Sequence, residues 1–183
     1  MPTASKILLT SQKLSIILQR LACQLVENHP SCENTVLIGL QPRGIHLLDR
    51  LLSILQSDYG LSNIESGYLD TTFFRDDFRR TEKIHSASPT QIAMDIEGKS
   101  VVLIDDVLYT GRSIRAALTA IDSYGRPSNI ELMTLIDRRF SRHLPIQPDY
   151  LGAQIDALEG DKVRVKWEDT PENSLVYLEN KDA

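Results

Sequence analysis

The sequence is short of several features, and each shortage excludes a class of protein. Two cysteines, Cys23 and Cys32, stand in 183 residues without the spacing of a zinc site or of a disulfide framework, so we expect a reducing cytoplasm. The apolar run at residues 7–9 is far too short for a signal or membrane segment, which predicts a cytoplasmic protein without a membrane partner. The formal net charge of −5 argues mildly against indiscriminate binding of nucleic acids. What remains is the composition of one globular domain over residues 1–183, with 42% apolar and 25% charged residues.

The stretch at residues 101–113 organises the rest of the chain. Its first four residues are apolar, which predicts a buried strand of a parallel sheet, and two carboxylates, Asp105 and Asp106, follow them. A turn with Gly111 comes next, and apolar residues at i, i+3, i+4 and i+7 then predict a helix. Because open α/β folds bind ligands at the carboxyl ends of their strands, we expect a functional site at this turn.

The turn itself suits a phosphate group. Its amides lie at the N-terminus of the predicted helix, where backbone N–H groups have no partner within the helix, and the hydroxyls of Thr110 and Ser113 can also donate. Asp105 and Asp106 are poor partners for a phosphate but good acceptors for two vicinal hydroxyls, so a sugar 5-phosphate fits both ends. Two other interpretations stay open: a strand that ends in a solvated aspartate pair, and a pair that binds Mg²⁺, although we find no further acidic ligands on neighbouring strand ends.

The same stretch resembles a known family. Val101 to Ser113 is similar to the phosphoribosyl-diphosphate loop of the type I phosphoribosyltransferases. Asp105 to Arg112 resembles in particular the bifunctional pyrimidine operon regulator and uracil phosphoribosyltransferase family (PyrR). Further stretches agree: Arg43-Gly44-Ile45, Arg75-Asp76-Asp77, Gly125-Arg126-Pro127-Ser128, Leu144-Pro145-Ile146 and Asp149-Tyr150-Leu151-Gly152. The resemblance implies a three-layer α/β fold, with a central, mainly parallel sheet, helices on both of its faces and a small hood.

The resemblance also implies a reaction. A uracil phosphoribosyltransferase makes UMP and diphosphate from uracil and phosphoribosyl diphosphate (PRPP), with Mg²⁺ carried by PRPP near Asp105 and Asp106 and not bound directly by the protein. It further implies a homo-oligomer and a regulator of pyrimidine (pyr) operon expression that responds to UMP or UTP and binds the leader mRNA. A purine phosphoribosyltransferase and an RNA-binding regulator with little catalytic activity are the alternatives. Tyr109 stands where purine-transferring relatives have an acidic residue, which favours a pyrimidine.

The resemblance assigns roles to individual residues. Those expected to bind PRPP are Tyr109, Thr110, Gly111, Arg112, Ser113, Pro42, Arg43 and Gly44. Those expected to be catalytic are Asp105, Asp106 and Arg75. Those expected to bind the base are Asp137, Arg138, Tyr150 and Leu151. The resemblance also predicts a cis peptide bond between Pro42 and Arg43, at least with diphosphate bound.

Periodicity predicts the remaining elements. Residues 10–28 form a helix with an apolar stripe, and residues 35–40 form a buried strand that leads through the Pro42–Gly44 turn into another helix. Residues 63–74 alternate in polarity, which is typical of a strand near the edge of a sheet.

The later part of the chain contains the predicted loop and hood. Residues 75–95 are rich in charge and predict a flexible loop; by composition alone it is equally consistent with a solvated loop without a role, whereas the resemblance favours a lid. Residues 129–136 predict a strand, and residues 138–150 together with two C-terminal strands predict the hood.

Two departures from the family pattern concern RNA. The first helix has Gln19-Arg20-Leu21-Ala22-Cys23 in place of the expected Thr-Arg-x-x-His, and the run from Asp137 to His143 is one residue longer than in the family. The basic cluster in that run, formed by Arg138, Arg139, Arg142 and His143, can be a solvated rim, a base pocket or an RNA contact. We therefore predict weaker and more salt-sensitive RNA binding than a dedicated regulator shows.

Overall fold

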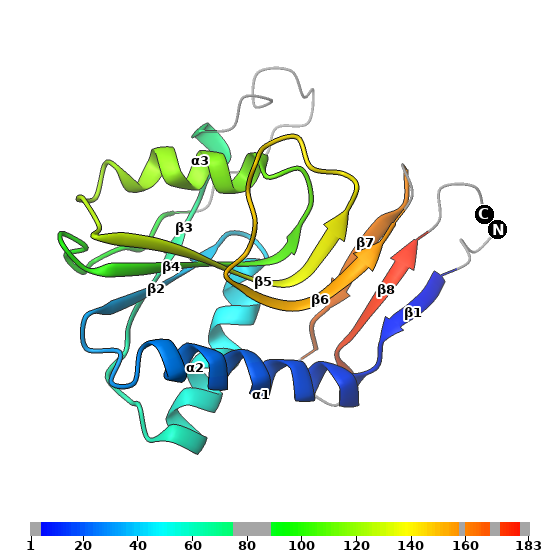
Figure 1. The fold of residues 1–183 in the computed structure, drawn as a ribbon, viewed down its shortest axis with the longest axis horizontal. Helices are drawn as coiled ribbons and strands as arrows, with labels where there is room; N and C mark the ends of the chain where they lie inside the picture. The colour runs from blue at the N-terminus through cyan, green and yellow to red at the C-terminus, as the bar shows by residue number, and fades with distance from the viewer. Residues whose placement is uncertain (1–4, 75–88, 158–159, 169–172, 180–183) are drawn as a thin grey trace.

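A five-stranded parallel sheet forms the centre of the molecule (Figure 1). The structure is a computed structural model and describes residues 5–74, 89–157, 160–168 and 173–179. Neighbouring strands follow the order β3-β2-β4-β5-β6, and each pair is parallel. The strands are β2 (Thr35–Leu40), β3 (Glu65–Leu69), β4 (Ser100–Leu108), β5 (Asn129–Arg139) and β6 (Tyr150–Asp156).

Helices cover both faces of this sheet. The helices α1 (Ser11–Asn28) and α2 (Gly44–Tyr59) pack on one face, and α3 (Arg112–Ile121) packs on the other (Figure 1). Successive side chains of a strand point to opposite faces. In β4, Val102 and Ile104 accordingly join the core under α1 and α2, whereas Val101 and Leu103 join the core under α3. One apolar run thus supplies both cores, as a strand buried on two sides must.

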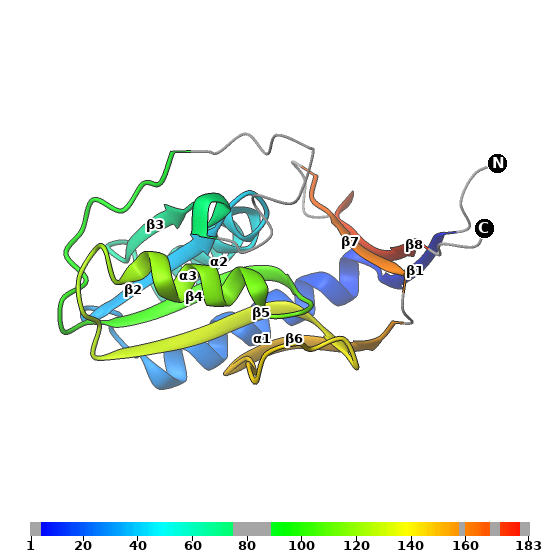
Figure 2. The same ribbon diagram turned by 90° about the horizontal axis from the view of Figure 1, so that it is seen from above.

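A second, three-stranded antiparallel sheet stands at one end of the domain. It has the order β1-β8-β7 and is formed by β1 (Ser5–Leu9), β8 (Leu175–Glu179) and β7 (Lys162–Lys166). Figure 2 shows it set apart from the central sheet. This sheet is the hood, and together with the three layers it confirms the predicted fold class.

The boundaries of several elements differ from the prediction. β4 and β5 continue past the apolar run because their ladder stays paired as far as Leu108 and Asp137, so both acidic positions lie within strands. β3 is shorter than residues 63–74 and is followed by a 3₁₀ turn at Thr72–Phe74. Residues 138–150, expected in the hood, form the end of β5 and the connection to β6. β1 was not predicted, because its partner in the ladder is the distant β8. No helix in the described ranges is long and apolar enough to span a membrane.

Candidate active site

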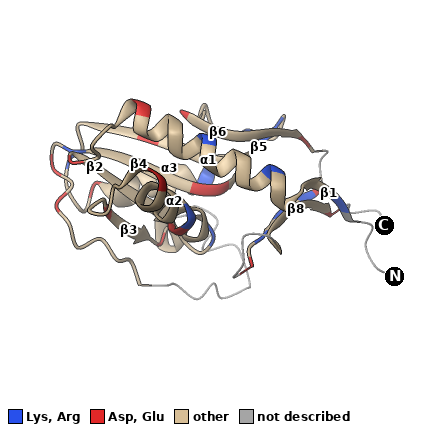
Figure 3. Cartoon of the chain, turned by 90° about the horizontal axis from the view of Figure 1, so that it is seen from below, with Lys and Arg blue, Asp and Glu red and all other residues tan. Residues whose placement is uncertain are grey.

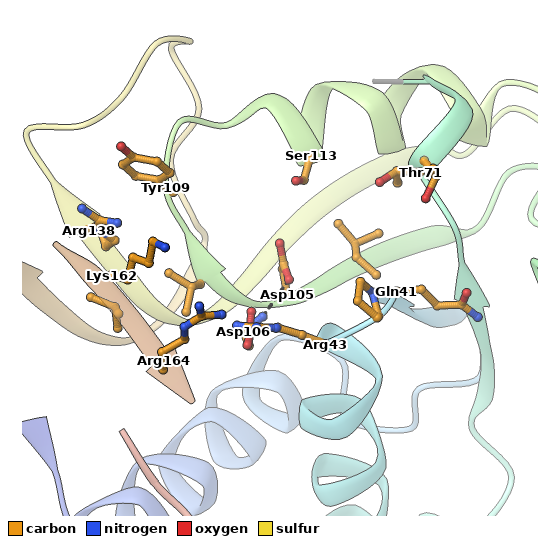
Figure 4. A pocket seen from close by; sticks show the side chains of 15 residues that line it. Gln41, Arg43, Thr71, Asp105, Asp106, Tyr109, Ser113, Arg138, Lys162 and Arg164 are labelled. Atoms are coloured by element: carbon orange, nitrogen blue, oxygen red, sulfur yellow. Dashed lines mark hydrogen bonds between the residues drawn. The ribbon is translucent and has the colours of Figure 1, made fainter. Parts of the chain in front are cut away.

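The carboxyl ends of the parallel strands open into a cavity of about 540 Å³ (Figure 4). This is the edge at which open α/β sheets bind ligands. Its walls come from the turn between β2 and α2, the segment after β3, the end of β4 with the following loop, the end of β5, and β7 of the hood. The lining residues are Leu40, Gln41, Pro42, Arg43, Thr71, Thr72, Asp105, Asp106, Val107, Tyr109, Ser113, Arg138, Lys162, Val163 and Arg164.

Asp105 and Asp106 lie in the middle of this cavity. As neighbours on β4 they point to opposite faces of the sheet, Asp105 towards α3 and Asp106 towards α2 (Figure 4). The Asp105 carboxylate accepts the Asp106 backbone N–H at 2.9 Å. The two carboxylates therefore flank the strand end, and a ligand lying across it can reach both.

Asp106 is a desolvated carboxylate. Its residue is 4% exposed, and its Oδ2 atom has no hydrogen-bond partner within the described part of the chain. Burial raises the pKa of Asp106, whereas the positive charges of Arg43 and His46 oppose that rise. A buried carboxylate oxygen that faces a cavity and lacks a partner is suited to accept a hydrogen bond from a ligand.

The turn before α2 comes very close to the acidic pair. A Cβ atom at Gly44 would lie 2.2 Å from the Ile104 carbonyl oxygen and 3.1 Å from the Asp105 Cα, so only glycine allows the approach. Pro42 and Arg43 consequently line the cavity next to Asp106. A cis peptide joins Gln41 to Pro42. The expected cis bond between Pro42 and Arg43 concerned the diphosphate-bound protein and stays a prediction.

The loop from Tyr109 to Ser113 forms a smaller hollow beside the main cavity. This hollow has a volume of about 100 Å³ and is lined by Asp105 and by residues 107–114. Gly111, the N-cap of α3, has φ 89° and ψ −3°, a left-handed conformation that favours glycine. The Thr110 hydroxyl accepts the Arg112 N–H at 3.4 Å. A compact hollow at a helix N-terminus is a shape suited to a phosphate group, and phosphate binding by this loop stays a prediction.

The end of the main cavity that lies away from Gln41 and Thr71 is aromatic and cationic (Figure 4). The Arg138 guanidinium lies over the Tyr109 ring, 4.1 Å from its centroid. Arg138 is 5% exposed, and its Nε and Nη2 atoms have no hydrogen-bond partner among the described residues. Lys162, Val163 and Arg164 of β7 complete this end. These three residues were not predicted in the site, because their only signal in the sequence was the alternation of a half-exposed strand.

The four residues predicted to bind the base do not come together. Arg138 lines the main cavity, whereas Asp137 and Leu151 line a separate cleft of about 330 Å³. Adjacent residues of one strand point to opposite faces of the sheet, which explains why the side chains of Asp137 and Arg138 line different hollows.

Tyr150 lies away from both the cavity and this cleft. It is 2% exposed, and its hydroxyl donates to Glu131 at 2.7 Å and accepts from Asn28 at 3.0 Å. Its partner in the β5–β6 ladder is Met133, well before the carboxyl end, so Tyr150 lines neither hollow, and base binding by Tyr150 stays a prediction. Arg75 lies outside the described residues.

Two arginines of the basic cluster, Arg139 and Arg142, are paired with carboxylates within the protein. Arg139 forms two hydrogen bonds with the Asp156 carboxylate, at 2.5 and 2.8 Å, and Arg142 pairs with Asp137. On the side of α1 and α2, acidic and basic residues are interspersed (Figure 3). Lys13, Arg20 and Arg50 are mixed there with Glu27, Asp49 and Asp58, so these two helices contain no run of basic residues.

Comparison with known proteins defines the class. A family model described as the phosphoribosyl transferase domain matches residues 4–168. A hypoxanthine phosphoribosyltransferase from Trypanosoma cruzi superposes with a TM-score of 0.71 at 18% identity, over 97% of this chain and 93% of the other. One from Staphylococcus aureus superposes with a TM-score of 0.66 at 19% identity, over 97% and 92%. At such identities these structures establish the shared fold, and with the matched domain they define a phosphoribosyltransferase.

Relatives that are similar in sequence show to which family of phosphoribosyltransferases the chain belongs. A protein named Bifunctional protein PyrR from Desulfosudis oleivorans is 39% identical over 170 residues, which cover 93% of each chain. Another of that name from Deinococcus radiodurans is 38% identical over 171 residues, 93% of this chain and 92% of the other. The chain belongs to the PyrR family of phosphoribosyltransferases. The family resemblance noted in the sequence is thereby confirmed.

Proposed function

We propose that the protein transfers the ribosyl 5-phosphate group of PRPP to uracil, giving UMP and diphosphate. The observation that carries this proposal is the order of groups along one cavity. The phosphate hollow and the Pro42–Gly44 turn, each suited to an anion, flank Asp105 and Asp106, and the end with Tyr109 and Arg138 lies beyond them. PRPP has the same order of phosphate, diol and diphosphate, with the base to be joined at the anomeric carbon.

The base end favours a pyrimidine. Uracil presents two carbonyl acceptors on a small ring, and Arg138 offers buried guanidinium donors beside an aromatic ring. Tyr109 replaces the acidic residue that the resemblance leads us to expect in a purine enzyme. The hypoxanthine enzymes among the similar structures share the fold at under 25% identity and carry no argument about the base.

Catalysis then rests on positioning and electrostatics. Cleavage of the anomeric bond passes through a transition state with oxocarbenium character, as in other glycosyl transfers. Asp105 and Asp106 accept the two ribose hydroxyls and place negative charge next to the developing cation. Holding both reactants in one cavity supplies the further gain of orientation. Arg75 stays a catalytic candidate on sequence grounds.

The residues of the cavity are suited to an Mg²⁺ ion that enters bound to PRPP. The described residues contain no group of three or more His, Cys, Asp or Glu side chains that could hold a metal ion. Asp105 and Asp106 offer hard oxygen atoms where PRPP would bring its phosphates, and Mg²⁺ commonly combines one or two carboxylates with substrate phosphates. Bound there, Mg²⁺ would neutralise charge on the diphosphate.

A regulatory role is the second part of the proposal. The relatives are named bifunctional proteins, and we infer that this chain likewise regulates pyrimidine gene expression in response to UMP or UTP, as a homo-oligomer. A gel shift with the native leader transcript, with and without UMP, tests this role. Its result does not bear on transfer activity.

The transfer activity is tested with the purified protein, PRPP and Mg²⁺. We expect turnover of uracil and slower or no turnover of hypoxanthine and guanine. The control is the double variant Asp105→Asn/Asp106→Asn, which should lose at least ~10²-fold in rate, the scale of a lost preorganised charge, while it stays folded. Faster turnover of a purine would contradict the choice of base, and full activity of the folded double variant would contradict the site.

A further inference from the structure

The connection between β5 and β6 lies against the outer side of the phosphate loop. The His143 N–H donates to the Thr110 carbonyl at 3.0 Å, and Arg142 Nη1 donates to the Tyr109 carbonyl at 2.6 Å. An ideal Cβ atom at Gly111 would lie 3.2 Å from Ile146. Three consecutive loop residues thus touch this connection, which Figure 4 shows passing beside the Tyr109 loop.

Arg142 is anchored from its other side. Its Nη2 atom pairs with the Asp137 carboxylate, and the two side chains are 22% and 8% exposed. Asp137 is opposite Leu108 in the β4–β5 ladder, directly before the loop begins. One guanidinium therefore joins a fixed strand position to the first carbonyl of the loop. Neither Arg142 nor Asp137 lines the main cavity.

These contacts set the direction of the loop amides. In a planar trans peptide the C=O and N–H groups point in opposite directions. With the carbonyls of Tyr109 and Thr110 held by the outer connection, the N–H groups of Thr110 and Gly111 point away from it, towards the hollow. No hydrogen bond within the described ranges uses these two amides as donors.

From this geometry we propose that Arg142 and Asp137 are positioning residues that orient the loop amides towards the 5-phosphate. The inference rests on the proposed function and deepens it, because it replaces base binding by Asp137 with a role in binding PRPP. The planar fork of arginine bonds a carboxylate and a carbonyl at the same time. A lysine ammonium at the same position keeps the charge but lacks this fork.

The experiment measures two anions separately by calorimetry on the purified full chain. In Arg142→Gln, the Kd of ribose 5-phosphate should rise ~10-fold, as for the loss of one charge-assisted hydrogen bond. The Kd of magnesium diphosphate, bound by the turn at Arg43, should stay unchanged. In transfer assays the KM of PRPP should rise while the KM of uracil does not.

The matched control is Arg139→Gln. It removes a bidentate ion pair with Asp156 from the same strand end without touching the loop, so both Kd values should match the wild type. Arg142→Lys keeps a cation beside Asp137, so it guards against misfolding, and it should show a smaller rise in the Kd of ribose 5-phosphate.

Two results would overturn the inference. One is equal affinity of Arg142→Gln and Arg139→Gln for ribose 5-phosphate; the other is a parallel loss of both anions in Arg142→Gln and Arg142→Lys, which indicates a general structural role. A wild-type protein that neither binds ribose 5-phosphate nor transfers it would instead refute the proposed function.

Discussion

Replacing Asp106 by asparagine should make the protein more stable and less active. The folded protein holds the Asp106 carboxylate at 4% exposure with one oxygen unpartnered, and burial raises its pKa. A pKa that is higher in the folded than in the unfolded state means that ionisation at neutral pH opposes folding. Asparagine has nearly the same shape and no charge, so Asp106→Asn removes this cost.

The size of the stability gain depends on how much of the cost of burying the charge the neighbouring groups already offset. An unsatisfied buried polar group costs ~1–3 kcal/mol and a charged one costs more. The asparagine amide still bears the first cost, so the substitution removes only the excess due to the charge, part of which Arg43 and His46 already offset here. We expect a gain of about 1 kcal/mol, which corresponds to a rise in Tm of about 2–4 °C for a domain of this size. In the proposed reaction the same negative charge stabilises the developing cation of the transition state, so kcat/KM should fall by roughly 10².

The assay is thermal unfolding of both proteins across pH, alongside transfer kinetics. The difference in Tm should be largest at neutral pH and shrink as the pH falls through the folded-state pKa of Asp106, because the wild-type carboxyl then becomes neutral as well. A lower Tm for Asp106→Asn at neutral pH would refute this account of the desolvated carboxylate. Unchanged kcat/KM would show that the charge does not act on the reaction.

Two further predictions concern the loop and RNA. Gly111→Ala should cost about 1–2 kcal/mol of stability because φ is 89°, and should raise the KM of PRPP, whereas Gly60→Ala, with φ 71° and open space around it, should lower Tm alone. In gel shifts, binding of the leader transcript should be weak and lost as salt rises, because Arg139 and Arg142 are paired with carboxylates. Tight, UMP-dependent binding at physiological salt would contradict this expectation.

Local sequence determined the two strand–turn–helix units that carry the acidic pair and the glycine turns at Gly44 and Gly111. The buried runs at Thr35–Leu40 and Val101–Ile104 are long enough, and sufficiently β-branched, to specify strands. Glycines at 44 and 111 mark the turns where backbone must approach closely or adopt a positive φ. These signals are short-range, so a single sequence was sufficient to place Asp105, Asp106 and the phosphate loop in one site.

Only the tertiary structure decided which distant segments complete that site. The hood depends on pairing of β1 with β8 from the other end of the chain, and it brings Lys162 and Arg164 to the end of the cavity that holds Tyr109 and Arg138. Register placed Tyr150 opposite Met133, and the alternation of strand faces separated Asp137 from Arg138. Such pairings follow from the packing of whole elements, because a shift of one residue in register exchanges the two faces of a strand. A local residue pattern shows which face of a strand is apolar, but it does not identify the distant strand with which it pairs.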